Sequence, residues 1–378
     1  MRVYFDNAAT TAIDDDVLQE MFVVMRENYG NPSSIHADGR KVRTIIETAR
    51  KKVASLLKVS PAEIFFTSGG TEADNTAIVR GIKDNGISHV VSSPLEHHAV
   101  LHTLAELEKE GCIKLDLLKV DALGHVDLSQ LEELLKKNPR TLVSLMHANN
   151  EIGTLADIEK IAKLCSDYDA LFHTDTVQTM GHFVHDLSSL NVSFLAGAAH
   201  KFHGPKGVGF LYVNHRVKIK PFIHGGAQER NMRGGTENVY GIVGLAKALE
   251  IAYEHMDEHR TYIQGLKDYM REQLIQQIPG ISFNGEQNSE KSLYTVLNVS
   301  FPPTDMADML LFNLDIAGIS ASGGSACSSG SNIGSHVLTA IGVKPENPSI
   351  RFSFSKYNTK EEVDFVVSKL KEVCLENV

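Results

Sequence analysis

The stretch 199–209 (AHKFHGPKGVG) contains two lysines among glycines and a proline that favour turns. An apolar segment precedes it, and in α/β proteins the residues just after a strand are where reactive groups are placed. A lysine held there away from bulk water has a lowered pKa and can form a Schiff base with a carbonyl cofactor. The alternative for Lys201 and Lys206 is an exposed surface position. The choice depends on what the rest of the chain places nearby.

Two features indicate a cofactor with a phosphate and a cationic ring. Residues 68–72 (SGGTE) form a glycine turn between a predicted strand and helix, where N–H groups and the helix dipole bind phosphate. The alternative is an ordinary helix cap made by Thr71. Asp175 ends another predicted strand, and a buried aspartate there needs a cation such as the ring N–H of pyridoxal phosphate (PLP). The alternative is an aspartate that caps the next segment.

The spacing of Asp175 and Lys201 leaves room for one more strand, so the two side chains are expected at neighbouring strand ends. This selects Lys201 over Lys206 as the reactive amine. His97 also follows a predicted strand, where it could stack on a flat cofactor or transfer protons. The chain has 17 histidines, and composition alone does not separate His97 from the others, among them His98, His102, His203 and His336.

Two further segments could act on a substrate. Cys327 lies in residues 322–331 (SGGSACSSGS), a glycine- and serine-rich stretch in which a thiol could attack or carry sulfur. The alternative is a small residue filling a turn. Arg351 lies in a predicted strand and could grip a carboxylate with two hydrogen bonds, or it could form a surface ion pair of little energetic value.

Length and composition indicate a globular enzyme of two domains. The 378 residues are 42% hydrophobic and 22% charged. The net charge of −10 is unfavourable for direct, non-specific nucleic-acid binding. The sequence shows neither a signal peptide nor an apolar run of about 18 residues, and its four cysteines form no CxxC pair. We therefore predict a cytoplasmic protein with no membrane association, no disulfide framework and no metal site.

Predicted strands and helices alternate over residues 64–197. The strands are expected at 64–67, 89–92, 113–120, 141–146, 171–174 and 194–197, with helices between them. This alternation predicts a mostly parallel sheet that binds ligands at the C-terminal ends of its strands. A long helix at 238–258, which continues after a break through 278, leaves this domain. The remainder predicts a smaller α+β domain, with strands at 294–301 and 349–354 and helices at 306–313 and 360–373.

Taken together, the motifs closely resemble the cysteine desulfurases of the NifS/IscS-like type, in the class-V aminotransferase group of fold-type I PLP enzymes. They cover nearly the whole chain: 4–11 (YFDNAATT), 30–34 (GNPSS), 66–72 (FTSGGTE), 96–97 (EH), 149–153 (NNEIG), 200–201 (HK), the polar run 225–238 and 324–327 (GSAC). The resemblance implies a seven-stranded, mostly parallel sheet in a large domain at 15–257. A small α+β domain would combine 1–14 with 258–378.

The resemblance also implies a role for each site residue. Lys201 would hold PLP as a Schiff base, Asp175 would pair with the ring nitrogen, Gln178 would contact the phenolic oxygen and His97 would stack on the ring. Phosphate contacts would come from Gly70, Thr71, His200 and, from a second subunit of a homodimer, Thr236. L-cysteine would be held through its carboxylate by Asn150 and Arg351, and Cys327 would accept its sulfur as a persulfide, releasing L-alanine.

One position departs from the family pattern. Ala198 stands where relatives usually have a serine or threonine, so one phosphate hydrogen bond is expected to be missing. The sulfur acceptor would be a protein of iron–sulfur cluster assembly or tRNA thiolation. The alternatives are a selenocysteine lyase or an aminotransferase on the same scaffold, and a non-catalytic sulfur-relay platform. A transaminase has no use for Cys327.

Overall fold

A computed structural model of the chain describes residues 1–303, 309–323 and 334–375. Its centre is a seven-stranded sheet with the strand order β2-β8-β7-β6-β5-β3-β4. The strands are β2 (Ile64–Thr67), β3 (His89–Ser92), β4 (Lys114–Leu117), β5 (Thr141–Ser144), β6 (Leu171–Asp175), β7 (Phe194–Ala198) and β8 (Gly209–Val213). All neighbouring pairs are parallel except the two that involve β8. The predicted mostly parallel α/β sheet is therefore confirmed.

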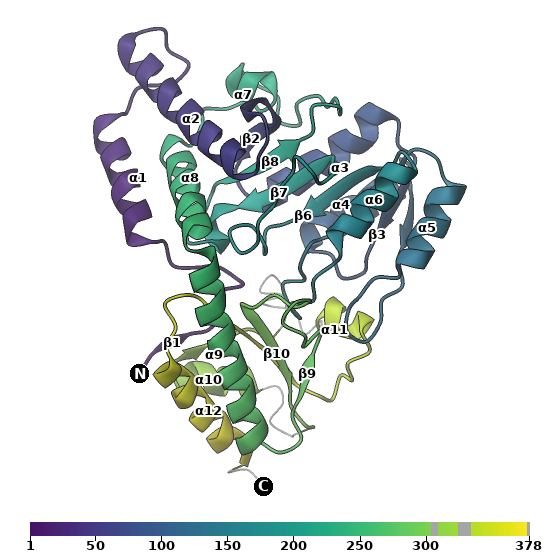
Figure 1. The fold of residues 1–378 in the computed structure, drawn as a ribbon, viewed down its shortest axis with the longest axis vertical. Helices are drawn as coiled ribbons and strands as arrows, with labels where there is room; N and C mark the ends of the chain where they lie inside the picture. The colour runs from purple at the N-terminus through teal and green to yellow at the C-terminus, as the bar shows by residue number, and fades with distance from the viewer. Residues whose placement is uncertain (304–308, 324–333, 376–378) are drawn as a thin grey trace.

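Helices cover both faces of this sheet (Figure 1). One face is covered by α3 (Gly70–Asn85) and α4 (His98–Lys109), and the other by α2 (Ala37–Leu56), α5 (Leu128–Lys137), α6 (Ile158–Asp167) and α8 (Val239–Glu254). Side chains of a strand alternate between the faces. In β7, Phe194 and Ala196 pack with α3, whereas Leu195 packs in the larger core with α2 and α8. Aspartates at positions 127 and 157 cap the starts of α5 and α6.

The strand pattern alone identified six of the seven strands and missed β8. This strand is a five-residue apolar run that begins directly after the glycine-rich turn. The turn between β7 and β8 is too short for a crossover helix, so β8 returns antiparallel to β7. A short glycine-containing link between two apolar runs was the signal for it, and seven strands were implied only by the family resemblance.

A second core lies below the sheet in Figure 1, where α9 (Met256–Gln277) continues from α8 after a break at His255. Its antiparallel sheet has the order β12-β10-β9, made of β9 (Ser282–Asn284), β10 (Val296–Ser300) and β12 (Ser349–Ser353). The remaining elements are β11 (Ile319–Ser320), α10 (Leu310–Ile316), α11 (His336–Ala340) and α12 (Lys360–Leu375). The helix predicted at 306–313 has its first residues outside the described part of the chain.

The N-terminus joins this second core. Strand β1 (Val3–Tyr4) pairs in parallel with β11, and Val3 and Phe5 pack among side chains of α9, β10, β12 and α12. The next helix, α1 (Asp15–Glu27), packs instead with the core around the large sheet. These two cores support the predicted division into 15–257 and 1–14 with 258–378, which stays a prediction. None of the helices in the described ranges is long and apolar enough to cross a membrane.

Candidate active site

The C-terminal edge of the large sheet brings together four of the predicted site positions. Lys201 ends the short 3-10 helix that follows β7, and Asp175 is the last residue of β6. His97 caps the start of α4 after β3, and Gly70 starts α3 after β2. Parallel strands end at the same edge of a sheet, so residues distant in sequence meet there.

The N-terminal segment crosses this edge and contacts the lysine. Lys201 Nζ donates hydrogen bonds to the carbonyl oxygens of Ala8 at 2.6 Å and Ala9 at 2.9 Å. Gln178 Nε2 donates to the same Ala8 oxygen at 3.0 Å. The sequence marked 6–11 as a polar turn and a family motif, but it did not predict that its backbone would hold the amine. The segment therefore brings Lys201 and Gln178 to one place.

Asp175 is a buried acid beside this lysine, with 6% of its surface exposed. Burial and the nearby Asp74 raise its pKa to about 7, against the opposing effects of the Val177 N–H, His173 and Lys201. The capping alternative is also observed, because Asp175 Oδ1 accepts a hydrogen bond from Val177 N at 2.8 Å. A cation that arrives at this carboxyl would stabilise its ionised form. The ring N–H of PLP fits that requirement.

The start of α3 offers hydrogen-bond donors for a phosphate. Gly69 occupies the N-cap with φ +156° and provides no side-chain cap, so N–H groups of the first turn keep their capacity to donate. Thr71 is the second residue of the helix, so the alternative that it serves as the cap is wrong. A Cβ at Gly70 would lie 2.7 Å from Val177 Cγ2, which explains the glycine. Ala198 is fully buried and has no hydroxyl to donate here.

Two histidines at the site are neutral at physiological pH. Burial and the charge of Lys201 lower the pKa of His97 and of His200 to about 4 each. His97 Nδ1 accepts a hydrogen bond from Ala99 N at 3.1 Å, which fixes the ring at the start of α4. His200 Nδ1 lies 3.2 Å from Thr10 Oγ1. A neutral, fixed imidazole is suited to stacking on an aromatic ring.

Arg351 is buried, and its predicted alternative as a surface ion pair is wrong. Its side chain is 1% exposed, and Nη2 donates to Asp6 Oδ1 at 2.8 Å. Nη1 donates to the carbonyl oxygen of Asn150 at 2.9 Å, so the two predicted substrate-binding residues are in contact. Arg351 Nε has no hydrogen-bond partner within the described part of the chain. Two of the five guanidinium N–H donors are thus used by Asp6 and Asn150, which leaves donors for an anionic group.

Cys327 lies in 324–333, outside the described residues, but both flanks of that segment contact the site. Ser322 Oγ donates to Asp6 Oδ1 at 2.9 Å, on the same carboxylate that binds Arg351. Ser335 Oγ donates to the buried carboxylate of Glu151, next to Asn150. The described residues Ser322 and Ser335 therefore lie close to Arg351 and Asn150, through Asp6 and Glu151.

Thr236 is exposed and lines a cavity of about 180 Å³ together with Ser68 and Arg233. Within its own chain it thus lies near the turn that precedes α3. Its predicted contact with the phosphate of a partner subunit stays a prediction. Sequence reasoning did not identify the buried acids Asp74 and Glu96 or the buried His173, because no local pattern distinguishes them from ordinary helix, loop and strand residues.

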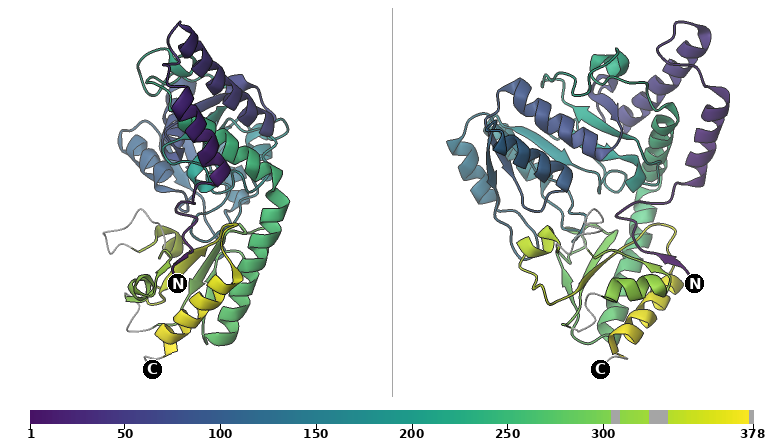
Figure 2. Two further views of the ribbon diagram at one scale, coloured as in Figure 1. Left: turned by 90° about the vertical axis from the view of Figure 1, so that its left-hand side faces the viewer. Right: turned by 180° about the vertical axis from the view of Figure 1, so that it is seen from behind.

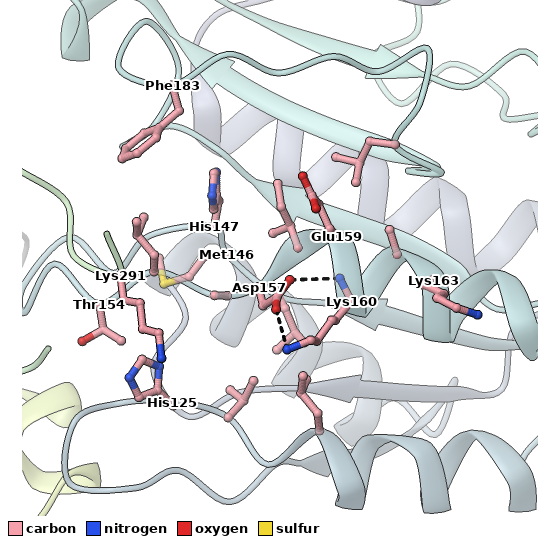
Figure 3. Close-up of a pocket in the computed structure, with 18 of the residues that line it drawn as sticks. His125, Met146, His147, Thr154, Asp157, Glu159, Lys160, Lys163, Phe183 and Lys291 are labelled. Atoms are coloured by element: carbon pink, nitrogen blue, oxygen red, sulfur yellow. Dashed lines mark hydrogen bonds and ion pairs between the residues drawn. The ribbon is translucent and has the colours of Figure 1, made fainter. Parts of the chain in front are cut away.

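A larger cavity of about 1,040 Å³ opens elsewhere between α6 and the loop 183–191 (Figure 3). None of the predicted cofactor or substrate residues lines it. Its labelled charges are partly paired, since Lys160 Nζ lies 3.1 Å from Asp157 Oδ2 and Lys163 Nζ lies 2.6 Å from Asp167 Oδ2. Its lining also includes Glu96 after β3 and Asn149 after β5, so it borders the sheet edge that carries Lys201.

A lysine and an acid at neighbouring strand ends, beside an uncapped helix start and a neutral histidine ring, define the fold-type I class of PLP-dependent enzymes. The lysine amine fits the aldehyde of PLP, the acid would accept a hydrogen bond from the ring N–H, the N–H groups of the helix start would donate to the phosphate, and the histidine fits the ring face. The chain belongs to the aminotransferase class-V family, whose model matches residues 3–366. The family resemblance predicted from the sequence motifs is confirmed.

Similar proteins of known name cover the whole chain. A cysteine desulfurase IscS of Dictyoglomus turgidum is 44% identical over 376 residues, which are 98% of this chain and 94% of that protein. A solved NifS-like protein is 41% identical with a TM-score of 0.92, and each chain is covered completely. The structure of SspA in complex with cysteine is 33% identical with a TM-score of 0.80, over 95% of this chain and 100% of that one. The family uses PLP.

Proposed function

We propose that this chain is a PLP-dependent cysteine desulfurase that converts L-cysteine to L-alanine and transfers the sulfur to Cys327. The observation that carries the proposal is the position of Lys201 beside Asp175 and the uncapped start of α3, at one sheet edge. Full-length relatives named cysteine desulfurases support the same reaction. A solved relative that contains cysteine supports the substrate.

PLP supplies an aldehyde that links to an amine and a ring that accepts electrons from the substrate α-carbon. Gly70, Thr71 and His200 would hold its phosphate, Gln178 its phenolic oxygen, Asp175 its ring nitrogen and His97 its ring face. Lys201 is the amine, and after release it would move the proton at the α-carbon. Arg351 and Asn150 would bind the substrate carboxylate, with Arg351 Nε as an available donor.

Cys327 would receive the sulfur as a persulfide. Its thiolate attacks the sulfur of L-cysteine, an S–S bond forms, and the C–S bond of the substrate breaks. The carbon keeps the electron pair and takes a proton, so L-alanine leaves and no external oxidant is needed. The anchors of the flanking residues at Asp6 and Glu151 support delivery of this thiol to the clamp around Arg351.

Replacing Cys327 with alanine is expected to abolish the persulfide and to reduce alanine formation to a small residual rate. Mass spectrometry after incubation with L-cysteine measures one added sulfur on the Cys327 peptide of the wild type. The matched control is Cys112→Ala, because Cys112 is the exposed free thiol. Full desulfurase activity of Cys327→Ala would contradict the proposed role of this thiol.

The alternative reactions make different products. An aminotransferase on this scaffold requires a keto-acid acceptor and leaves Cys327 unmodified, whereas a desulfurase forms alanine from cysteine alone. A selenocysteine lyase would release selenium faster than sulfur from the matched substrates. A relay platform would acquire sulfur only from another persulfide. The same mass measurement, repeated with selenocysteine and with a keto acid, separates these cases.

A homodimer is part of the proposal, and an apolar stripe on α1 supports it. Leu18, Phe22 and Met25 recur at helical spacing on α1, Tyr29 follows its end, and each is between 43% and 82% exposed. The opposite side of α1, with Val17 and Val24, is buried against the large core. Figure 2 shows α1 on the outer surface of the molecule. We propose that a second copy covers this stripe and that Thr236 of one subunit contacts the phosphate of the other.

The substitution Phe22→Asp is expected to convert the dimer to a monomer and to weaken PLP binding. Burying a charge in the apolar interface is unfavourable, and the monomer would lack Thr236 of its partner. Light scattering coupled to size-exclusion chromatography measures the mass, with Ile275→Asp as a control at another exposed apolar residue on α9. A dimer that persists in Phe22→Asp would rule out this face as the interface.

The persulfide sulfur would pass to an acceptor protein in iron–sulfur cluster assembly or tRNA thiolation, in the cytoplasm. Incubation of sulfur-labelled protein with an iron–sulfur scaffold protein and with a tRNA-thiolating enzyme distinguishes these pathways. The acceptor protein that gains the labelled sulfur identifies the pathway.

A further inference from the structure

Four ionisable side chains lie together in the core beneath the sheet edge. Asp74 on α3 and Glu96 after β3 are each 1% exposed, and His173 on β6 is fully buried. Asp175 is the fourth member, two residues after His173 on the same strand. Burying several such groups costs stability, so a buried cluster at a site with perturbed pKa values points to a functional role. The role proposed for Asp175 leaves Asp74 and His173 unexplained.

The contact between Asp74 and His173 is close and separated from solvent. His173 Nε2 lies 3.3 Å from Asp74 Oδ1, and neither atom has a well-aligned hydrogen-bond partner among the described residues. His173 Nδ1 lies 2.9 Å from Ser144 Oγ, which fixes the other side of the ring. His173 and Asp175 alternate with Thr174 along β6, so both side chains face α3. A small movement of either group completes the bond between the carboxyl and the imidazole.

We propose that Asp74 and His173 share one proton as an uncharged pair and act as positioning residues for Asp175. The inference rests on the proposed function, in which Asp175 meets the cationic ring nitrogen of PLP. Because Asp74 and His173 carry no charge as a pair, Asp175 is the member of the cluster that becomes anionic when the cation binds. Burying a second negative charge beside it would be unfavourable.

The electrostatics of the neighbours agree with this arrangement. Burial raises the pKa of Asp74 to about 8 and lowers that of His173 to about 4, so the shared proton belongs to Asp74 near neutral pH. Burial also raises the pKa of Glu96 well above its usual value, with further contributions from Asp175 and Asp74. Outside the cluster, Lys201 is the charged group that acts on it, through Asp175. Asp175 alone receives both a backbone N–H bond and the charge of Lys201.

The first test uses the protein without cofactor. Asp74 is protonated in the folded state between about pH 4 and 8, but it is ionised in the unfolded state over the same range. Its contribution to stability is therefore present below pH 4 and is lost as the pH rises toward 8. Asp74→Asn should release about one proton fewer on unfolding at pH 6, measured from the pH dependence of the unfolding free energy. An unchanged proton release would overturn the proposal.

The second test separates positioning from a purely structural role. Asp74→Asn keeps the shape and a donor toward His173 Nε2, whereas Asp74→Leu keeps the volume and removes the donor. PLP added to the cofactor-free protein should bind Asp74→Asn within about twofold of the wild type and Asp74→Leu about tenfold more weakly. The pH midpoint of the absorbance of bound PLP should also shift in Asp74→Leu. A modest loss of stability is expected in Asp74→Leu as well, because His173 Nε2 is left buried without a partner.

Wild-type affinity in Asp74→Leu would overturn the positioning role, and so would a loss of affinity with no shift in the pH midpoint of the bound-PLP absorbance. Asp175→Asn is the positive control, because it removes the direct contact. If the wild type bound no PLP at all, the proposed function would fail. The proton release measured in the first test would still show whether Asp74 is protonated in the folded protein.

Discussion

Lys201→Ala is expected to give a colourless protein that forms no alanine above the uncatalysed background. Only a primary amine at this position can link covalently to an aldehyde cofactor and then move a proton at the substrate. The amine is held for this purpose by the carbonyl oxygens of Ala8 and Ala9. Two measurements follow the effect: absorbance of the purified protein, and mass spectrometry of the Lys201 peptide after reduction with borohydride. The wild-type peptide should carry the added mass of PLP.

Lys206→Ala is the matched control, because Lys206 lies in the same glycine-rich stretch and is exposed. It should keep its colour and activity. Because Lys201 also binds the N-terminal segment, circular dichroism and a thermal melt must show that Lys201→Ala is folded. A folded Lys201→Ala protein with normal activity would exclude Lys201 as the reactive amine. If Lys206→Ala lost its colour instead, Lys206 would be the reactive amine.

The alternation of strands and helices could be predicted because each element has its own periodic pattern. The β5 and β6 strands are short and buried, each with two adjacent apolar residues, and α5 and α6 begin at aspartate caps. The pattern failed at β8, where a strand follows a turn without an intervening helix. It also could not show that Val3 and Phe5 pack with α9 and α12, because that contact joins the two ends of the chain.

The site could be predicted where function depends on residue type at a strand end, as for Lys201, Asp175 and His97. It could not be predicted where function depends on burial. Asp74 has the local sequence of an ordinary helix residue, and its unusual pKa arises entirely from its removal from water. The sequence around Arg351 is compatible with a surface ion pair. Its contacts with Asp6 and Asn150 in the folded chain show that it is buried instead. Both depend on neighbours that are far away in the sequence.

Glu229→Gln is expected to destabilise the large domain by about 3–5 kcal/mol, the usual cost of leaving one partner of a buried ion pair uncompensated. Glu229 and Arg50 form two parallel hydrogen bonds of 2.7 and 2.8 Å, and both side chains are 2% exposed. Glu229 Oε2 also accepts from Phe66 N at 2.9 Å, within the strand β2 that leads to the phosphate turn. Urea unfolding of the cofactor-free protein measures the change.

The ion pair also fixes the polar run 225–238, because Glu229 and Arg230 both have positive φ and would not hold that backbone unaided. Glu229→Gln should therefore weaken PLP binding as well, through Thr236 in the same run. An exposed pair is the control: Asp167→Asn, opposite Lys163, should cost less than about 1 kcal/mol. The double variant Arg50→Met, Glu229→Gln removes both charges and should recover part of the stability, because no unpaired charge is left in the core. A Glu229→Gln protein no less stable than Asp167→Asn would show that the pair contributes little to this fold.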